Sequence, residues 1–357
     1  MMERPIAGAE EATPEWLTAA LYQQGVLHQG HVTQVMASPP EAGFSSLTWR
    51  LLLSYSSDAS SNVPGRLFLK CSRADLVPGE TDTDKVRREI DYYQRLAPLM
   101  MRSPSVPCYA AAYDPHAETS HLLLLDVSET HNACVDPCHP ENPQRAVRAL
   151  ARLHAFWWDH PRLESLVGEL PTQERLHADW ADGARRTEAF VEMLGDRLPR
   201  HWRDTYARVL RSLPNLCRRH LSGQNLTLVH GDAHLGNYLF SRTPNVDETY
   251  IIDWQFWHAT IGGTDLAFMM AAKWEPEIRR RMERPLLQRY YDTLLEQGVS
   301  GYPWDQCWDD YRLSVILVSI FIPVWQWSLF GWQADLLAVE RGMRALDELG
   351  CAELLDA

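Results

Sequence analysis

The stretch His230-Gly-Asp-Ala-His-Leu-Gly-Asn237, followed by Ile251-Ile-Asp-Trp254, decides the fold that this sequence predicts. The two stretches hold two carboxylates and one carboxamide, those of Asp232, Asn237 and Asp253. A carboxylate on a loop is suited to accept a proton, and carboxylate and carboxamide oxygens are hard ligands of the kind that Mg²⁺ prefers. The three side chains therefore predict a site that handles a proton and a magnesium ion.

The apolar runs beside these residues predict how the residues meet. Tyr238-Leu-Phe240 and Tyr250-Ile-Ile252 are typical of short strands, and Ser241 to Thr249, which contains Pro, Asn and Asp, is typical of a hairpin connection. If the two runs pair antiparallel, Asn237 and Asp253 stand at the same end of the ladder. We then expect them to share one magnesium ion.

The loop from His230 to Asn237, called the Asp232 loop below, follows the apolar run Thr227-Leu-Val229, which predicts a strand. Asp232 is expected to receive or orient the proton of an acceptor hydroxyl. Taken singly, His230, Asp232 and Asn237 are also common turn formers. Their combination with Asp253, Lys70 and Glu89 in this order along the chain favours the functional interpretation. His230 itself is expected to tie down the loop backbone rather than to shuttle a proton.

The N-terminal part predicts two strands and a helix that carry a cation and its partner. Leu47 to Tyr55 alternates in a mostly period-two pattern, and Arg66 to Lys70 makes the return strand. Asp82 to Leu96 has helical periodicity and places Glu89 among its core-facing positions. An unpaired buried charge is expensive, so Glu89 needs a partner, and Lys70 is expected to supply it.

The order of these patterns predicts two lobes, although a chain of 357 residues also has room for one large domain. The apolar strand from His121 stops at Asp126, and the chain then becomes polar as far as Pro143. We therefore predict an N-lobe of residues 1–125 and a C-lobe of residues 126–357. Strand patterns dominate the first lobe and helical patterns the second, so the expected fold class is α+β.

Gly43-Phe-Ser-Ser46 precedes the first of these strands and is the candidate phosphate loop. Backbone N–H groups around Ser45 and Ser46 are suited to cradle a phosphate. The segment has a single Gly and departs from the protein-kinase glycine pattern. An ordinary loop between strands remains the alternative interpretation.

Two further residues keep more than one interpretation. His234 can face the acceptor, bond the loop backbone or be exposed, and we assign it no role. Asp265, in the run Gly262-Gly-Thr-Asp265, can anchor the Asp232 loop through backbone N–H bonds or cap the following helix. Either role for Asp265 is structural.

The formal net charge of −13 argues against a nucleic-acid partner, because such surfaces need clustered Lys and Arg. The best candidate cluster, Arg279-Arg280-Arg281 with Arg284, stands beside Glu275, Glu277 and Glu283. We interpret it as a solvated helix face.

The cysteines and one apolar segment bear on the compartment. Seven scattered Cys, and an N-terminus without the pattern of a secretory signal, favour the reducing cytoplasm. Cys134 and Cys138 are interpreted as loop thiols rather than a metal knuckle. Leu313 to Trp332 holds twenty residues without a charge, yet Ser, Pro, Gln and Gly interrupt it, so a core helix is expected rather than a membrane span.

The motifs together resemble the aminoglycoside phosphotransferase and choline kinase superfamily, including its ecdysteroid-kinase-like members. The similarity rests on His230-Gly-Asp232, Asn237, Ile252-Asp-Trp254 and Asp265-Leu-Ala267, and extends to Lys70, Glu89 and the run Leu122 to Asp126. It covers roughly residues 15 to 350, judged by the placement of the motifs. The resemblance implies a bilobal protein-kinase-like fold in which the N-lobe binds the nucleotide.

The resemblance also implies a role for each matching residue. Asp232 would be the catalytic base, Asn237 and Asp253 the magnesium ligands, Lys70 the phosphate-binding lysine and Glu89 its partner. The hinge, with Leu124 and Asp126, would bond the adenine of ATP through its backbone.

The expected function is ATP- and magnesium-dependent phosphorylation of a hydroxyl group on a small molecule, and the alternative is a catalytically silent nucleotide-binding pseudokinase. Three acceptor classes compete: an aminoglycoside, choline, or an apolar alcohol such as a steroid. The tryptophans of the C-terminal region can line an aromatic pocket or simply pack in the core; they are Trp304, Trp308, Trp325, Trp327 and Trp332.

Overall fold

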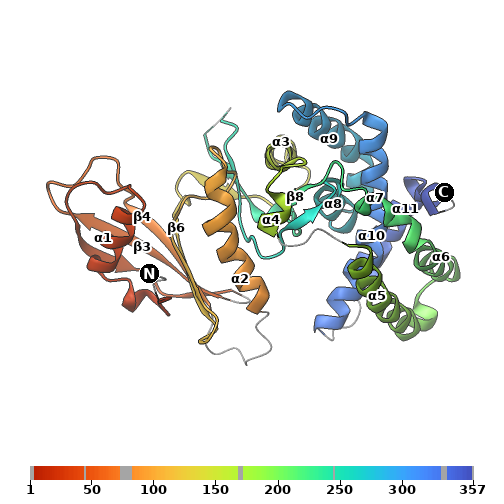
Figure 1. Ribbon diagram of the computed structural model, residues 1–357, viewed down its shortest axis with the longest axis horizontal. Coiled ribbons are helices and arrows are strands. Elements are labelled where there is room, and N and C mark those ends of the chain that lie inside the picture. The colour runs from red at the N-terminus through yellow and green to blue at the C-terminus, as the bar shows by residue number, and fades with distance from the viewer. Residues whose placement is uncertain are drawn as a thin grey trace. The chain divides into compact units, whose positions relative to one another are not determined.

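The computed structural model describes residues 4–43, 46–72, 83–167, 172–243, 246–330 and 336–355. The chain forms two compact units (Figure 1). Unit 1 comprises Met1–Asn132 and Ser241–Phe256, and unit 2 comprises Ala133–Phe240 and Trp257–Ala357. The predicted lobes, 1–125 and 126–357, were divided where the apolar strand from His121 stops at Asp126, and the role assigned to each lobe stays a prediction. Ser241–Phe256 packs with unit 1, although the residues on both sides of it belong to unit 2. One boundary in the sequence therefore cannot divide the chain into these units.

Unit 1 is built on an antiparallel sheet with the strand order β1-β3-β4-β6-β5. The short strand β2 pairs with the N-terminal end of β3. Neighbouring strands in the chain are mostly neighbours in the sheet, as short connections require. The strands are β1 (Val32–Ala37), β2 (Glu41–Ala42), β3 (Ser46–Tyr55), β4 (Arg66–Ser72), β5 (Cys108–Asp114) and β6 (Thr119–Leu125).

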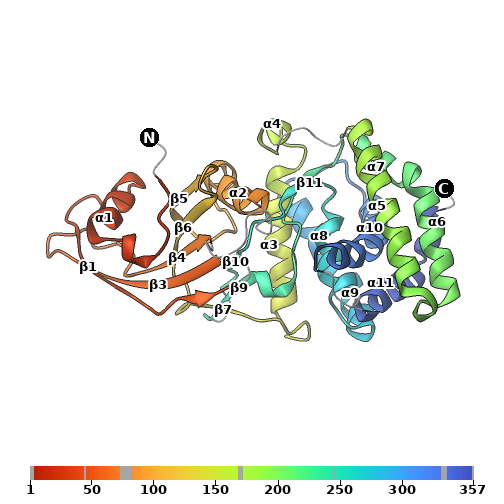
Figure 2. The ribbon, with the colours of Figure 1, turned by 90° about the horizontal axis from the view of Figure 1, so that it is seen from below.

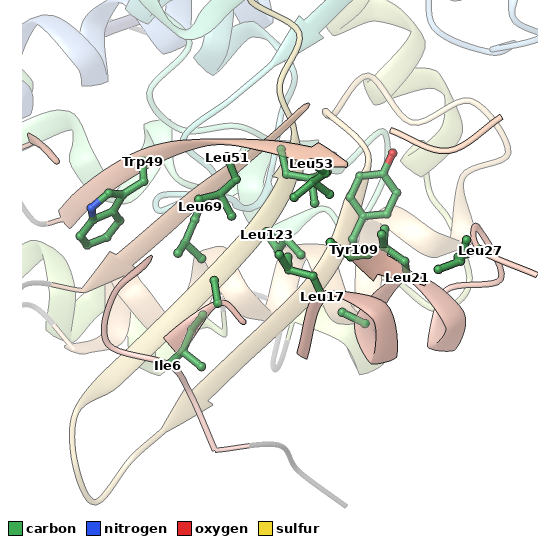
Figure 3. Packing of buried hydrophobic residues seen from close by; sticks show 14 of the residues in the cluster. Ile6, Leu17, Leu21, Leu27, Trp49, Leu51, Leu53, Leu69, Tyr109 and Leu123 are labelled. Carbon is green, nitrogen blue, oxygen red and sulfur yellow. The ribbon is translucent and has the colours of Figure 1, made fainter. Parts of the chain in front are cut away.

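The core of unit 1 lies between this sheet and the helix α1 (Pro14–Gln23), as Figure 3 shows. The period-two pattern of β3 turns Leu51 and Leu53 toward Leu17 and Leu21 of α1. Each fully buried Leu contributes about 1.5–3 kcal/mol relative to an exposed one. The predicted strand at Leu47 to Tyr55 is confirmed.

The helix predicted from Asp82 to Leu96 has two parts. Asp82 lies outside the described residues, α2 runs over Thr83–Asp91, and a π-helix, η2, continues it over Tyr92–Leu96. The wider turn buries Tyr92 and Tyr93 side by side, which the regular helical period did not predict. A short 3-10 turn, η3, follows at Ala97–Leu99.

Unit 2 is mainly helical. In it α10 packs against α5, α8 and α11, α3 packs against α9, and α5 lies beside α6 (Figure 2). Its helices are α3 (Asn142–Trp157), α4 (Leu163–Val167), α5 (Gln173–Leu194), α6 (Arg200–Leu216), α7 (Arg218–Leu221), α8 (Gly263–Ala267), α9 (Pro276–Glu296), α10 (Trp304–Phe330) and α11 (Leu336–Glu348).

Two small sheets complete the fold. β8 (Thr227–Val229) pairs antiparallel with β11 (His258–Thr260), a strand that the sequence patterns did not predict. A three-stranded sheet has the order β10-β9-β7, formed by β7 (His131–Ala133), β9 (Tyr238–Ser241) and β10 (Thr249–Ile251). Because β9 and β10 are neighbours, the predicted hairpin is confirmed.

The uncharged run from Leu313 falls within α10, whose side chains at Leu313, Val315, Ile316 and Ile320 are buried. The predicted end of the run, Trp332, lies outside the described residues. Among the helices that the structure describes, none combines the length and the apolar character needed to cross a bilayer.

The interpretation of Arg279-Arg280-Arg281 as a solvated face is wrong for its first member. Arg279 is 1% exposed and donates to Glu283 Oε2 at 2.8 Å, and it also bonds Glu348. The turn of α9 directs this one arginine inward, where two carboxylates offset the burial of its charge. Arg280 and Arg281 remain exposed.

Candidate active site

In unit 1, Lys70 of β4 contacts two carboxylates. Its Nζ donates to Glu89 Oε1 at 2.9 Å and Oε2 at 2.7 Å, and to Asp253 Oδ1 at 3.2 Å. The predicted pairing of Lys70 with Glu89 is confirmed. Burial by itself lowers the pKa of Lys70, but the two carboxylates outweigh it and raise this pKa above its usual value. Lys70 is therefore a fixed cation.

The segment that carries Asp253 is held by aromatic and amide contacts. Trp254 stacks on Tyr92 of η2, with ring centroids 3.7 Å apart and an interplanar angle of 6°, and its Nε1 donates to Ile251 O at 2.9 Å. Gln255 Nε2 reaches Glu89 Oε2 at 3.5 Å. Asp253 itself has φ +68°, a left-handed conformation that Asp tolerates better than most residues. The carboxylate is thus positioned by its neighbours on both sides.

The candidate phosphate loop is described only in part. Ser45 lies outside the described residues, whereas Ser46 is buried at the start of β3. A small cavity of about 10 Å³ is lined by Ser46, Lys70, Glu89 and Gln255, among others. Ser46 is therefore brought together with the lysine and glutamate that the sequence predicted to lie near phosphate.

The two hinge candidates lie at the end of β6. Leu124 is paired in register with Phe68 on one side and Cys108 on the other. Asp126 donates its backbone N–H to Arg66 O at 3.3 Å, and its Oδ1 accepts the N–H of Ser128 at 2.9 Å. The N–H of Asp126 is therefore already used in a hydrogen bond to the start of β4. The adenine-binding role of both residues stays a prediction.

In unit 2, the Asp232 loop brings its carboxylate and its carboxamide together. Asn237 Nδ2 donates to the backbone oxygen of Asp232 at 2.9 Å and to its Oδ2 at 3.2 Å. This orientation turns the amide nitrogen of Asn237 toward the carboxylate and leaves the amide oxygen as the group of the type that Mg²⁺ binds. His230 Nδ1 accepts the N–H of Asp232 at 3.3 Å, which fits its predicted role in tying down the loop.

Asp265 anchors the backbone of the Asp232 loop. Its fully buried carboxylate accepts the N–H of His230 at 2.7 Å and that of Gly231 at 2.8 Å, and it lies 3.2 Å from His154 Nε2. Burial opposes ionisation of Asp265, but these hydrogen bonds and the charge of the neighbouring imidazole lower its pKa below the usual value. Of the two interpretations that the sequence left open, anchoring is the one observed.

His154 is a residue whose part in the site the sequence did not reveal. Its Nδ1 lies 2.8 Å from the hydroxyl of Tyr290, so α3 and α9 are both joined to the Asp265 anchor. Gly262 allows this approach, because a Cβ there would lie 2.2 Å from Tyr290 Oη and 2.8 Å from His154 Nδ1. The only sequence signal was a histidine on the apolar face of a helix.

His234 caps the 3-10 turn η5 (Leu235–Asn237), because its Nδ1 accepts the N–H of Gly236 at 3.1 Å. Its Nε2 lies 3.6 Å from Asp232 Oδ2. Of its three interpretations, bonding to the loop backbone is observed.

The aromatic residues proposed for an acceptor pocket are half-buried: Trp304, Trp308, Trp325 and Trp327. Trp304 and Trp308 stack with centroids 6.4 Å apart, and the guanidinium of Arg284 lies 5.4 Å from the Trp308 ring. The chain's own arginine thus occupies a face that a ligand cation would use. Trp332 lies outside the described residues.

The predicted metal ligands can be tested by their chemistry. The part of the chain that the structure describes holds no group of three or more His, Cys, Asp or Glu side chains suited to a metal ion. Mg²⁺ in nucleotide sites commonly takes only one or two protein oxygens and completes its shell with phosphates and water. The amide oxygen of Asn237 and the carboxylate of Asp253 are each donors of that type, and their sharing of one ion stays a prediction.

An antiparallel sheet with a Lys–Glu ion pair, together with a helical region that carries an anchored Asp–Asn loop, defines a protein-kinase-like α+β fold. The predicted fold class is confirmed. The chain belongs to the phosphotransferase enzyme family, whose model matches residues 37–302. The predicted resemblance to the aminoglycoside phosphotransferase and choline kinase superfamily is therefore confirmed as well. A search of the curated proteins found no match.

Solved structures of low sequence identity share this fold. A mutant of aminoglycoside 2′-phosphotransferase IIIa in complex with GDP has a TM-score of 0.54 at 14% identity, covering 96% of this chain and 98% of its own. An ethanolamine kinase from Plasmodium vivax has a TM-score of 0.51 at 13% identity, covering 88% and 82%. A microcompartment-associated aminopropanol kinase has a TM-score of 0.50 at 13% identity, covering 90% and 91%.

Proposed function

We propose that this protein is a small-molecule kinase that transfers the γ-phosphoryl group of ATP, with Mg²⁺, to a hydroxyl group. The observation that carries the proposal is the contact of Lys70 with both Glu89 and Asp253. A lysine held by a buried glutamate, beside a second carboxylate, is suited to bind phosphate on one side while the carboxylate binds a metal. Membership of the phosphotransferase family supports the same activity.

In this proposal each site residue has a separate task. Asp232 accepts the proton of the attacking hydroxyl, and Asp265 holds the loop so that the carboxylate does not move. Lys70 binds the nucleotide phosphates with the backbone around Ser45 and Ser46. The hinge at Leu124 and Asp126 bonds the adenine.

Asn237 and Asp253 would hold the magnesium ion. When bound, Mg²⁺ neutralises phosphate charge and so lowers the barrier to transfer. The seven cysteines are free thiols in the structure, which supports a reducing compartment, and we propose the cytoplasm.

The acceptor is a small-molecule alcohol whose class is open. The three structural neighbours are named for an aminoglycoside, ethanolamine and aminopropanol, all of them amino alcohols. An amine-bearing acceptor agrees with the net charge of −13, although overall charge is weak support for a particular pocket. Amino alcohols are therefore the first group to test, followed by quaternary ammonium and apolar alcohols.

The test is a screen by mass spectrometry in which purified protein and Mg-ATP are incubated with a mixed library of alcohols. Some alcohol should gain a phosphoryl group, and Asp232→Ala should abolish the gain while leaving nucleotide binding largely intact. Asp196→Ala is the matched control, because Asp196 is fully exposed and far from the loop in sequence. Full turnover by Asp232→Ala would contradict the assignment of the base. Nucleotide binding without transfer to any alcohol would favour the pseudokinase instead.

A further inference from the structure

The tautomer of His234 is fixed by the loop on which it lies. Its Nδ1 accepts a hydrogen bond from the backbone N–H of Gly236 at 3.1 Å. A backbone N–H can only donate, so Nδ1 carries no proton in this arrangement and the ring proton resides on Nε2. The imidazole therefore presents a donor, Nε2–H, on its other side.

That donor lies beside the candidate base. Nε2 is 3.6 Å from Asp232 Oδ2, which is too long for a direct hydrogen bond. An oxygen atom placed about 2.7 Å from Oδ2 and about 2.9 Å from Nε2 would bond both groups, with an angle of about 80° at that oxygen. The side chains of His234 and Asp232 are 36% and 23% exposed, so a ligand can reach the position.

Hydrogen bonds within the Asp232 loop fix the position of the His234 imidazole relative to the Asp232 carboxylate. The backbone oxygen of Asp232 accepts the N–H of His234 at 2.8 Å, and the Asn237 side chain bonds the same oxygen at 2.9 Å. Gly236 lets the imidazole lie flat against the turn, because a Cβ there would stand 2.9 Å from its Nδ1 and Cε1. The separation between Nε2 and Oδ2 is thus set by a short, heavily bonded segment.

We propose that His234 is a second catalytic residue, which donates Nε2–H to the oxygen of the acceptor hydroxyl while Asp232 accepts the proton of that hydroxyl. This inference rests on the proposed function. The acceptor O–H bond breaks and its proton passes to Asp232; the oxygen bonds to the γ-phosphorus. The bond from that phosphorus to the β-phosphate oxygen breaks, and the nucleoside diphosphate leaves with the electron pair. His234 keeps its proton throughout.

The Nε2–H group of His234 acts by orienting the acceptor oxygen. A hydrogen bond from Nε2 occupies one lone pair of the acceptor oxygen and turns the other toward the phosphorus. Phosphoryl transfer proceeds through a loose transition state in which positioning contributes most of the rate enhancement. Loss of His234 should therefore lower kcat and leave the affinity for nucleotide nearly unchanged.

Two substitutions separate the role of Nε2–H as a hydrogen-bond donor from the role of Nδ1 in capping η5. Asn at position 234 retains an oxygen near the place of Nδ1, and Asn is a good N-cap, but it cannot reach the place of Nε2. Gln extends its amide nitrogen to about the place of Nε2 and gives up the cap. His234→Asn should keep the thermal unfolding midpoint while kcat falls about 100-fold, and His234→Gln should lower the midpoint while regaining part of kcat.

The assay does not require a known acceptor, because water can take the acceptor position. Hydrolysis of Mg-ATP in the absence of alcohol gives kcat and KM for each variant, and His116→Asn, at an exposed histidine of unit 1, is the matched control. A wild-type kcat in His234→Asn overturns the inference, and so does an equal loss of kcat in the Asn and Gln variants.

Failure of the inference is distinguishable from failure of the proposed function. If the wild-type protein transfers phosphoryl groups, Asp232→Ala does not, and His234→Asn does so at full rate, only the role of His234 is wrong. If the wild-type protein transfers none to water or to any alcohol, the proposed function fails and the role of His234 fails with it.

Discussion

Nε2 of His154 lies 3.2 Å from Oδ2 of Asp265, and both side chains are fully buried in unit 2. The carboxylate also accepts two backbone N–H groups of the Asp232 loop, so one imidazole and one carboxylate connect α3, α8 and that loop. In a low-dielectric interior each of these hydrogen bonds is strengthened, and each is expensive to leave unmade.

Asp265→Asn should destabilise the protein by about 3 kcal/mol, because the amide turns a donor toward groups that themselves donate. The Asp232 loop loses its anchor, so kcat should also fall. Urea unfolding and initial rates measure the two effects. Asp196→Asn removes an exposed carboxylate and should change neither. A variant as stable as the wild-type protein would show that the anchor contributes little.

Gly262→Ala should impair the same network without removing any polar group. The new Cβ would stand 2.2 Å from Tyr290 Oη and 2.8 Å from His154 Nδ1, so one of the two side chains must move. We expect a loss of about 1–3 kcal/mol from overpacking, measured by thermal unfolding. Gly65→Ala is the control, since nothing lies within 4 Å of a Cβ at that position. Equal midpoints for the two variants would contradict the close approach.

Lys70→Met should leave Glu89 buried without its cation and destabilise unit 1 by about 3–5 kcal/mol. The double variant Lys70→Met/Glu89→Leu removes both charges, so its free energy of unfolding should recover most of the loss. Neither variant should bind ATP with wild-type affinity, because the phosphate-binding cation is absent. Chemical denaturation and calorimetric titration with Mg-ATP separate stability from binding. Recovery of ATP binding in the double variant would contradict the role of Lys70.

Asp253→Ala should weaken the magnesium dependence of ATP binding, because one carboxylate ligand is lost. The measurement is ATP affinity as a function of Mg²⁺ concentration, with the wild-type protein in parallel. The same variant also releases Lys70 from one of its two carboxylates, so binding of ATP without Mg²⁺ should change little or improve. An unchanged magnesium titration would remove Asp253 from the metal site.

Stability should decrease in mild acid because of His121. Its Nδ1 accepts the N–H of Ile6 at 3.1 Å, and burial lowers its pKa from 6.5 to about 4. The unfolded chain therefore binds this proton at a higher pH than the folded protein does. The stabilisation is complete above pH 6.5, is lost as the pH falls toward 4, and amounts to roughly 3 kcal/mol.

His220 has a pKa lowered to about 4, mainly by burial, so the two histidines together contribute about two protons to the slope over that range, and the lowered pKa values of His131 and His160 add to it. Urea unfolding at pH 7, 6 and 5 measures the slope. His121→Asn should reduce it by about one proton, whereas the exposed His116→Asn should leave it unchanged. A slope unaffected by His121→Asn would show that His121 remains solvated.

The sequence predicted those parts of the site that depend on local order along the chain. Asp232 and Asn237 lie five positions apart on one loop, so their hydrogen bonds follow from the turn itself. The pairing of Lys70 with Glu89 was predictable too, because a carboxylate on an apolar helix face must find a cation.

Contacts that join distant elements were not predictable in the same way. A histidine on an apolar face is compatible with many partners, so nothing in the pattern of α3 indicated that His154 meets Asp265 and Tyr290. The π-helical turn that places Tyr92 on Trp254 departs from the regular helical period. Arg279 was expected in solvent, because the second of its two charged partners, Glu348, lies 69 positions away in the chain.

The sequence by itself determined the family, the α+β fold class and the polar residues of the candidate site, because motif spacing and apolar periodicity are properties of the chain. Only the tertiary structure decided that Asp265 anchors the loop rather than caps a helix, and that His234 bonds Gly236 and flanks Asp232. The physical reason is that hydrogen-bond partners are selected by packing. A buried donor or acceptor bonds whichever group the fold brings within about 3 Å, and sequence spacing does not specify that group.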